Sequence, residues 1–188
     1  MIKKEIRIRY KLMRSSLNEE DRNESQNSFL YQFKELKLGA IKVLHHYLAV
    51  KEQYEISLDQ IIDTIKAGSI DLIQSVPVMK GDDMISVLYQ KGMFLCKNEW
   101  GIEEPLDQRQ IEEYSIDCVL VPLIAFDIQG NRVGYGKGCY DRFLTKCRKD
   151  VIKIGFSYFP PLESIDDTDE FDIPLNYCIT PERIYEFG

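Results

Sequence analysis

The segment GNRVGYGKGCYDRF, residues 130–143, joins flexible backbone to side chains that can bind an anion. Three of its glycines alternate with other residues, at Gly134, Gly136 and Gly138. Glycine reaches positive φ and lets a ligand approach the backbone closely. Arg132 and Lys137 add positive charge, and Asp141 adds a carboxylate that could hold Mg²⁺ against phosphate. The segment therefore predicts a phosphate-binding loop.

The glycine spacing differs from the familiar phosphate-binding motifs. It is neither G-x-x-x-x-G-K-[ST] nor G-x-G-x-x-G, so it matches neither a P-loop nor a Rossmann fingerprint. A turn that needs glycine only for packing is an alternative interpretation. Two cations and a carboxylate at the mouth of the loop favour a ligand, because a simple turn does not require them.

Other residues give weaker chemical signals. His45 and His46 are adjacent in a predicted strand, so their side chains point to opposite faces of a sheet. A histidine acid–base pair or metal site is therefore poorly supported, and we expect one ring to be buried and hydrogen-bonded. A flat slot for an aromatic ligand could involve four residues that are more often simply core, namely Tyr89, Phe94, Trp100 and Tyr135.

The elements that must position these residues alternate along the chain. Apolar periodicity and turn residues predict a helix over 2–13, a helix over 16–36, a strand over 41–50, a helix over 57–68, a strand over 70–79, a hairpin over 84–96, a strand over 116–122, a helix over 138–150 and a strand over 151–159. This order predicts a single α/β domain over residues 1–188. Its expected architecture is Rossmann-like, with three layers: a mostly parallel open sheet with helices on both faces.

Local signals predict some element boundaries. Two capping boxes predict helix N-termini, Ser16 with Glu19 and Ser57 with Gln60. Pro77 is expected near the end of its strand. The residues KGM, 91–93, are expected to form the turn of the hairpin.

The predicted elements place the glycine loop where α/β proteins bind ligands. The loop follows the apolar strand 116–122 and precedes the helix 138–150. Ligands of open α/β sheets bind beyond the carboxyl ends of strands. A helix N-terminus adds unpaired N–H groups and a partial positive charge, which favour phosphate.

The totals of the chain exclude several classes of protein. Its 188 residues are 44% hydrophobic and 29% charged, which is typical of one globular domain. The net charge of -7 argues against broad binding to nucleic acid or to an anionic membrane. No apolar run approaches the roughly 20 residues that span a bilayer, and the charged N-terminal segment does not resemble a signal peptide. The five cysteines are odd in number and lack a C-x-x-C pair, so we expect free thiols in the cytoplasm.

The segment VLVPLIAFDIQGNRVGYGKGCYDRFL, residues 119–144, resembles the signature of the 5-formyltetrahydrofolate cyclo-ligase family, also called 5,10-methenyltetrahydrofolate synthetases. Three weaker similarities extend along the chain, KKEIR at 3–7, WGIEEP at 100–105 and FDIPLNYCIT at 171–180. Val133 replaces a usual Leu, and Cys139 replaces the first Tyr of a pair. In the closing segment EFD replaces the usual HD, and Asn176 stands near an expected Asp.

The resemblance implies an ATP- and Mg²⁺-dependent reaction on a small molecule. In this family 5-formyltetrahydrofolate becomes 5,10-methenyltetrahydrofolate, with release of ADP and phosphate. Phosphorylation of the formyl oxygen gives an iminium phosphate that N10 of the folate attacks. Nothing in the sequence indicates an obligate protein partner.

The resemblance also implies ATP-binding and catalytic residues by position. The ATP-binding set is Lys3, Lys4 and Arg7 with Arg132, Val133, Gly134, Tyr135, Gly136, Lys137, Gly138, Cys139 and Tyr140. Arg132 and Lys137 are the expected catalytic residues. Phosphoryl transfer needs positioning and charge neutralisation more than it needs a protein nucleophile.

Folate and metal ligands are implied in the same way. The folate-binding set is Val50, Glu55, Trp100 and Tyr135. Glu52 is a rival for Glu55, because the stretch AVKEQYEIS is about two residues longer than the family pattern leads us to expect. The metal-binding set is Asp141 and Asp172, the second chosen from a group that also contains Asp166, Asp167 and Asp169.

Two other function classes stay open. Another ATP- and Mg²⁺-dependent enzyme on a similar sheet would keep the glycine loop but not the folate roles of Glu55 and Trp100. A phosphate-ligand binding module without catalysis would have less need for Asp141 and Asp172 to hold Mg²⁺. An ATPase assay with and without 5-formyltetrahydrofolate separates these alternatives.

Overall fold

A computed structural model describes residues 1–69, 71–98 and 101–188. Its centre is a seven-stranded sheet in the order β11-β10-β9-β6-β1-β2-β3. The strands are β1 Val43–His45, β2 Ile73–Lys80, β3 Asp83–Tyr89, β6 Cys118–Val121, β9 Ile152–Phe156, β10 Tyr177–Ile179 and β11 Ile184–Glu186. Neighbours pair in parallel from β10 to β2, and the two outer pairs, β2–β3 and β10–β11, are antiparallel. The predicted mostly parallel sheet is therefore confirmed.

The remaining elements surround this sheet. The helices are α1 Lys3–Ser16, α2 Glu19–Glu35, α3 Asp59–Gly68 and α4 Cys139–Lys146, with short 3-10 turns η1 Lys51–Gln53 and η2 Glu113–Ser115. Two small antiparallel sheets are formed by β4 Leu95–Lys97 with β5 Glu103–Pro105, and by β7 Ala125–Phe126 with β8 Arg132–Val133.

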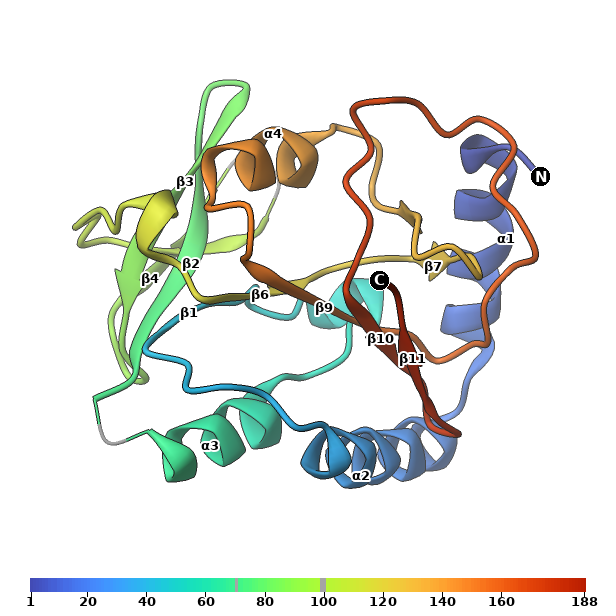
Figure 1. Cartoon of the computed structure of the whole chain (residues 1–188), viewed down its shortest axis with the longest axis horizontal. Helices are drawn as coiled ribbons and strands as arrows, with labels where there is room; N and C mark the ends of the chain where they lie inside the picture. The colour runs from blue at the N-terminus through green and yellow to red at the C-terminus, as the bar shows by residue number, and fades with distance from the viewer. Residues whose placement is uncertain (70, 99–100) are drawn as a thin grey trace.

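Helices cover both faces of the central sheet, as predicted. In Figure 1, α4 lies on one face, α2 and α3 lie on the other, and α1 stands beside the sheet near β7. The central strand β6 shows the cause, because its side chains alternate between the two faces. Cys118 and Leu120 join the core under α2 and α3, whereas Val119 and Val121 join the core under α4.

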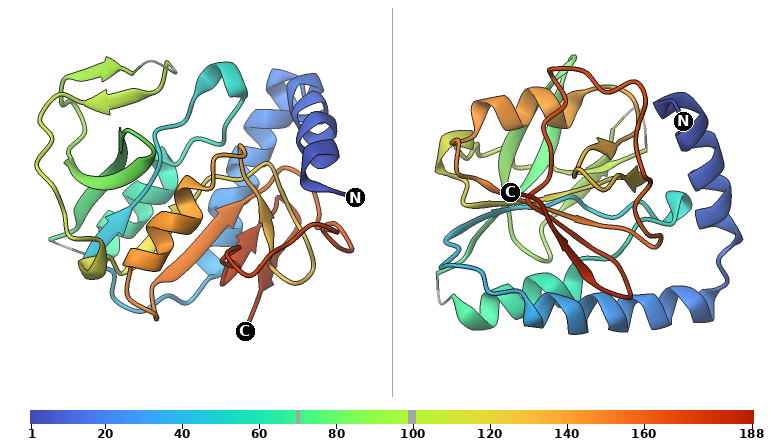
Figure 2. Two further views of the ribbon diagram at one scale, coloured as in Figure 1. Left: turned by 90° about the horizontal axis from the view of Figure 1, so that it is seen from above. Right: turned by 45° about the vertical axis from the view of Figure 1, so that its right-hand side comes forward.

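A third apolar cluster fixes α1 next to the glycine loop. Ile6 and Tyr10 lie one turn apart on α1 and pack with Ile124, Val133 and Ile165. Val133 belongs to β8, which leads directly into the loop. The two views of Figure 2 agree in placing α1 alongside this part of the chain. The basic N-terminal residues are thereby brought to the loop, far from them in sequence.

Several predicted boundaries are wrong. Residues 16–19 do not form the predicted cap: α1 runs to Ser16, and Asn18 caps α2 by accepting a hydrogen bond from the Asp21 N–H at 2.8 Å. The second box also fails, because Leu58 occupies the N-cap of α3 and makes no side-chain cap. Pro77 lies inside β2 rather than at its end. It is tolerated because β1 pairs only with residues 73–75, so the missing N–H of Pro77 faces no neighbouring strand on that side.

The predicted hairpin over 84–96 is wrong as well. The structure instead pairs β2 with β3 through a two-residue loop at Gly81 and Asp82, with Gly81 at φ 61°. β4 pairs with β5 rather than with β3. The KGM segment does turn, since Met93 N donates to Gln90 O at 3.1 Å, but it does not join paired strands. Both histidines, rather than one, are buried.

Candidate active site

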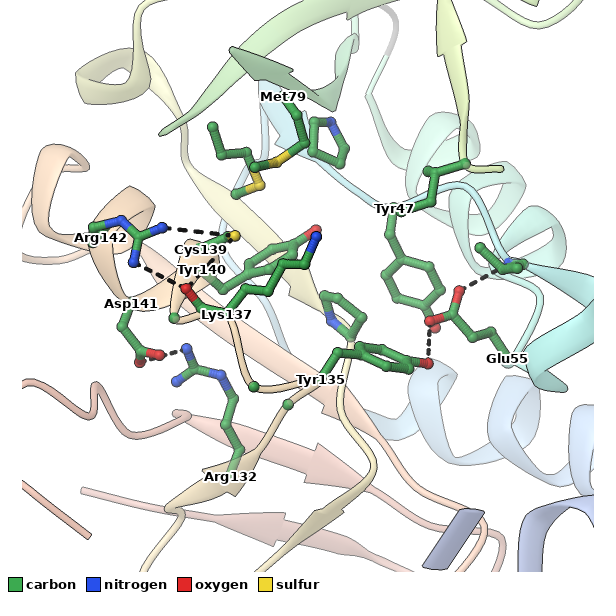
Figure 3. Close-up of a pocket in the computed structure, with 18 of the residues that line it drawn as sticks. Tyr47, Glu55, Met79, Arg132, Tyr135, Lys137, Cys139, Tyr140, Asp141 and Arg142 are labelled. Carbon is green, nitrogen blue, oxygen red and sulfur yellow. Dashed lines mark hydrogen bonds and ion pairs between the residues drawn. The ribbon is translucent and has the colours of Figure 1, made fainter. Parts of the chain in front are cut away.

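A pocket of about 850 Å³ opens where Tyr47 and Pro122 follow the carboxyl ends of β1 and β6. Its wall includes the start of α1, the segment 47–55 after β1, the β2–β3 hairpin, residues 102–104, the glycine loop with the start of α4, and the segment 169–172. The volume lies in the range of small-molecule sites, roughly 300–1,000 Å³. Figure 3 shows the side chains of the loop and of α4 facing Glu55 across this space. The site therefore lies at the edge of the sheet that the sequence predicts.

The glycine loop, residues 134–138, connects β8 to α4 along the pocket wall. Gly136 has φ 104°, and Gly138, the N-cap of α4, has φ 64°. Side chains other than glycine rarely adopt such angles. A Cβ atom on Gly136 would also lie 3.3 Å from Cζ of Arg7. The positive φ therefore requires glycine at 136, and an added side chain would also displace the Arg7 guanidinium slightly.

Two cations of α1 enter the same end of the pocket. Lys3 and Arg7 lie one turn apart, and both line it. The ammonium of Lys3 lies 2.5 Å from Asp172 Oδ2, and Arg7 Nε donates to the carbonyl of Gly134 at 2.8 Å. Lys4 is exposed and does not line the pocket. Lys137 is exposed on the loop and does line it.

Arg132 and Asp141 form an ion pair beneath the loop. The Arg132 side chain is only 4% exposed, and its Nη2 lies 2.7 Å from Asp141 Oδ1. Arg132 also donates to the carbonyl of Ile173, and Asp141 Oδ1 accepts from the N–H of Ile173 at 3.1 Å. The pair therefore ties the first turn of α4 to the segment that contains Asp172.

The carboxylates fit a magnesium ion only together with a phosphate ligand. Asp141 and Asp172 both line the pocket, but each already has a cationic partner, Arg132 or Lys3. Within residues 1–69, 71–98 and 101–188, no three metal-binding side chains gather as a cage. Mg²⁺ commonly takes one or two protein carboxylates and completes its shell with water and phosphate. The donor set suits that mode of binding.

The neighbouring aspartates have other partners. Asp166 pairs with the N-terminal ammonium of Met1 at 2.7 Å, and Asp167 accepts from the backbone N–H of Lys3 at 2.6 Å. Neither lines the pocket, whereas Asp169 does, with its carboxylate 3.9 Å from the Lys3 ammonium. These contacts hold the start of α1 against the segment 166–172.

Glu55 lies at the opposite end of the pocket. Its Oε2 accepts from the N–H of Val50 at 2.8 Å, and its Oε1 accepts from the Tyr135 hydroxyl. Val50 and Tyr135 line the pocket as well. Glu52 belongs to the exposed turn η1 and does not line it. The structure brings Glu55, and not Glu52, to the pocket.

Three tyrosines around Glu55 remain protonated at neutral pH. Burial raises the pKa of Tyr47, Tyr135 and Tyr140, and the negative charge of Glu55 raises each pKa further. The hydroxyls of Tyr47 and Tyr135 donate to the carbonyl of Ile56 and to Glu55 Oε1. The Tyr140 hydroxyl is buried and has no protein partner among the described residues.

Sequence reasoning missed the apolar wall of the pocket. Pro77, Met79 and Met84 of the β2–β3 hairpin line it. In the sequence they appear only as apolar residues that alternate within strands, and such alternation does not indicate what a face of the sheet contacts. Of the proposed aromatic slot, Tyr135 lines the pocket, whereas Tyr89 packs against the His46 ring and Phe94 is 85% exposed. Trp100 lies outside the described residues. Val133 is fully buried and does not line the pocket.

A sequence model of the 5-formyltetrahydrofolate cyclo-ligase family matches residues 1–180. The chain belongs to this family. The resemblance inferred from residues 119–144 is therefore confirmed, as is the expectation of an enzyme of the cyclo-ligase family.

Individual cyclo-ligases resemble the chain over different lengths. The 5-formyltetrahydrofolate cyclo-ligase of Mycoplasma genitalium is 37% identical over 73 residues, which cover 38% of this chain and 44% of that protein. The chain thus spans less than half of that relative. The 5-formyltetrahydrofolate cyclo-ligase of Escherichia coli K12 is 29% identical over 151 residues, which cover 77% of this chain and 83% of that protein.

Solved structures share the cyclo-ligase fold. The NMR structure of the Aquifex aeolicus 5,10-methenyltetrahydrofolate synthetase matches with a TM-score of 0.76 at 24% identity, over 99% of this chain and 93% of that one. A 5,10-methenyltetrahydrofolate synthetase from Mycoplasma pneumoniae matches with a TM-score of 0.73 at 21% identity, over 95% and 98%. Within the described ranges, no helix has the length and apolar character needed to cross a membrane.

Proposed function

We propose that the protein converts 5-formyltetrahydrofolate to 5,10-methenyltetrahydrofolate, using ATP and Mg²⁺ and releasing ADP and phosphate. The observation that carries the proposal is that the two ends of the pocket carry opposite charges. One end is a cationic glycine loop, and the other end is a glutamate held by Val50 and Tyr135. Membership of the cyclo-ligase family supports the same reaction.

In this proposal the loop end binds the ATP phosphates. Lys3, Arg7 and Lys137 supply positive charge, and bonds between such cations and phosphate are among the stronger hydrogen bonds in proteins. Gly134, where an added Cβ would meet no atom within 4 Å, leaves room for a phosphate to approach the backbone. The first turn of α4 adds a partial positive charge at the same place. Arg132 acts from below by holding Asp141 in position.

The glutamate end binds the folate in this proposal. The pteridine ring carries N–H donors along one edge, and a carboxylate is the natural acceptor for two such donors. Val50 and Tyr135 fix the two oxygens of Glu55 before the ligand arrives. Pro77, Met79 and Met84 offer an apolar surface for the flat rings.

The reaction then needs alignment rather than a protein nucleophile. The formyl oxygen attacks the γ-phosphorus of ATP, the bond to the ADP oxygen breaks, and ADP departs. N10 of the folate attacks the formyl carbon and loses its proton, and the C–O bond breaks to release phosphate. Lys137 is the most exposed of the loop cations and neutralises charge on the transferred phosphoryl group. Holding both ligands in one pocket supplies the proximity that the first step requires.

Asp141 and Asp172 would hold Mg²⁺ jointly with the ATP phosphates. An ion bound there would supply charge neutralisation on the ATP phosphates. The two carboxylates would then exchange part of their present contacts with Arg132 and Lys3 for the ion.

We assign this reaction to the cytoplasm. All five cysteines are free thiols, and three of them, Cys118, Cys147 and Cys178, are buried. Free thiols persist in reducing compartments.

The proposal is tested by mixing the protein with ATP, Mg²⁺ and 5-formyltetrahydrofolate and following the absorbance band of the methenyl product. We expect product only when all three are present, with ADP formed in equal amount. Glu55→Gln should retain ATP binding but lose product formation. ATP hydrolysis that is independent of the folate, or no product at all, would overturn the proposal in favour of another ATP-dependent enzyme or a binding module.

A further inference from the structure

Arg14 is a buried cation behind the proposed folate end of the pocket. It lies in the last turn of α1 and is 4% exposed. Its Nη2 donates to the carbonyl of Leu123 at 2.7 Å, and its guanidinium lies 6.0 Å above the Tyr158 ring. Its Nε is buried and has no hydrogen-bond partner among the described residues. Burying a charge is costly unless an opposite charge or hydrogen bonds compensate it, so the position of Arg14 calls for a nearby anion.

The Glu55 carboxylate is connected to Arg14 through one phenol. Arg14 Nη1 lies 3.5 Å from the Tyr135 hydroxyl oxygen, and the same hydroxyl donates to Glu55 Oε1. Burial raises the pKa of Tyr135, the charge of Glu55 raises it further, and the charge of Arg14 lowers it. The phenol therefore lies between a positive and a negative charge that both act on its oxygen.

A second, smaller cavity connects the same two charges. Its volume is about 10 Å³, and it is lined by Arg14 and Glu55 together with Tyr47, Ile56, Pro122, Leu123 and Phe156. This is close to the minimum space for one water molecule, which also needs two to four polar partners. The Arg14 guanidinium and the Glu55 carboxylate are available to such a water as donor and acceptor.

We infer that Arg14 is a positioning residue for the folate site, holding Glu55 through the Tyr135 hydroxyl and through one water in the small cavity. This inference rests on the proposed function, because it takes Glu55 as the residue that binds the folate. Arg14 does not line the larger pocket, so it acts on the ligand only through Glu55 and Tyr135. Its fixed charge keeps the carboxylate oriented toward the pocket.

The test compares binding of the two substrates separately. Arg14→Met keeps the length of the side chain and removes the charge. We expect the dissociation constant for 5-formyltetrahydrofolate, measured by calorimetry without ATP, to rise about tenfold, as loss of one charge-assisted contact implies. The dissociation constant for ATP should stay the same, since the cations of the loop end are untouched. If Arg14 has a purely structural role, the substitution should weaken the binding of both ligands, and that result would overturn the inference.

A matched control is Arg148→Met. Arg148 pairs with Asp117 at 2.8 Å, just before β6 begins and therefore at the opposite edge of the sheet from the pocket. Its loss should lower stability without changing the affinity for the folate. If Arg14→Met does not fold, Arg14→Lys replaces it as the test. The shorter lysine cannot donate to the Leu123 carbonyl and the Tyr135 hydroxyl at the same time, so it should also weaken folate binding without weakening ATP binding.

A double-mutant cycle tests the route of the coupling. If Arg14 acts through Tyr135, the effects of Arg14→Met and Tyr135→Phe on folate affinity should be less than additive. Additive effects would overturn the route through the phenol. Glu55→Gln separates the two levels of proposal. If Glu55→Gln weakens folate binding but Arg14→Met does not, only the present inference is overturned. If the wild-type protein fails to bind the folate, the proposed function is overturned.

Discussion

At the scale of single residues, the loop end of the pocket contains cations that differ in how exposed they are to solvent. Arg132 is 4% exposed in its pair with Asp141, and Lys3 is 15% exposed in its pair with Asp172. Lys137 is exposed on the glycine loop. A phosphate can recruit an exposed side chain without first burying or unburying a charge. Among these cations, Lys137 is therefore the one whose loss should weaken ligand binding most and lower stability least.

Lys137→Ala should raise the KM for ATP about tenfold or more, because a charge-assisted phosphate contact is worth roughly 1.5–3 kcal/mol. The melting temperature should not change. Steady-state kinetics and calorimetry measure the two quantities. Lys149→Ala is the control, since Lys149 is also exposed, lies just beyond α4 and does not line the pocket. An unchanged KM for ATP in Lys137→Ala would contradict the assignment of the loop.

Asp141→Asn separates a metal role from a structural one. As a metal ligand, Asp141 should lose affinity for Mg²⁺ on losing its charge, so turnover should fall and partly recover at high Mg²⁺. If Asp141 serves only to hold Arg132 and Ile173, asparagine keeps one acceptor oxygen, and any loss should not depend on Mg²⁺. Turnover against Mg²⁺ concentration at saturating ATP decides between them. Asp63→Asn, at an exposed site on α3, is the control.

At the scale of elements, α1 and the glycine loop form one unit although 127 positions separate Arg7 from Gly134. The apolar contacts of Ile6 and Tyr10 hold the helix against β8, and Arg7 then fills the space that Gly136 leaves. The loop can take this path only because glycine tolerates φ 104°. A side chain at this position would disturb the backbone and Arg7 together.

Gly136→Val should therefore abolish product formation in a protein that still folds. A β-branched residue does not easily adopt positive φ, and its Cβ would meet the Arg7 guanidinium at 3.3 Å. Circular dichroism checks the fold, and product absorbance checks activity. In Gly39→Val the new Cβ would meet no atom within 4 Å, so that variant should remain active. Near-normal turnover of Gly136→Val would show that the loop backbone does not meet ATP.

Local sequence signals predicted the four helices and the strands β1, β2, β3, β4, β6 and β9. They did not predict the short strands β5, β7, β8, β10 and β11, nor how the strands pair. The local spacing of apolar residues indicates helices and strands, and the glycine loop is one contiguous motif, so both could be predicted. The hairpin was not, because GD at 81–82 and KGM at 91–93 are both good turns and only the distant register of β2 decides between them. In the same way SSLNEED offers several N-caps, and Asn18 prevails through its bond to Asp21 N–H. The roles of Arg14 and of the apolar wall of the pocket could not be predicted, because the segments involved come together only in the folded chain.

At the scale of the whole molecule, two buried histidines link stability to acid. Burial lowers the pKa of His45 to about 3, and the neighbouring His46 lowers it too. Burial likewise lowers the pKa of His46. In the unfolded chain both pKa values lie near about 6.5. Below that pH the unfolded state binds more protons than the native state, so acid favours unfolding.

The free energy of unfolding should thus be insensitive to these histidines above about pH 6.5. Below it, the free energy should fall by up to about 1.4 kcal/mol per pH unit for each histidine. Urea unfolding at pH 7, 6 and 5 measures the slope. His45→Asn, which keeps a polar group near Ser75 and Ser86, should reduce the slope by the share of one histidine. A slope that the substitution leaves unchanged would assign the acid sensitivity to carboxylates.

Gly155 shows how tightly the sheet packs under the pocket. A Cβ atom there would lie 2.4 Å from Leu123 Cδ2 and 2.9 Å from Leu175 Cδ1. Gly155→Ala should lower the free energy of unfolding by about 1–3 kcal/mol through overpacking. Denaturant unfolding measures this loss, with Gly39→Ala as a control whose new methyl group meets nothing within 4 Å. Equal stability of the two variants would mean that Leu123 and Leu175 repack without strain.

The bond between the Lys3 ammonium and Asp172 joins residues that are 169 positions apart. On the ribosome, chains grow at roughly 5–20 residues per second, so Lys3 emerges many seconds before its partner. The apolar face of α1 finds its partners at Ile124, Val133 and Ile165, whereas Lys3 gains its partner only when residue 172 has been made. In the proposed function, affinity for ATP should therefore appear only after residue 172 has been made, and a nascent chain truncated before that residue should not sequester ATP. Contacts between residues so far apart in sequence also slow folding, because a long loop must close before they form.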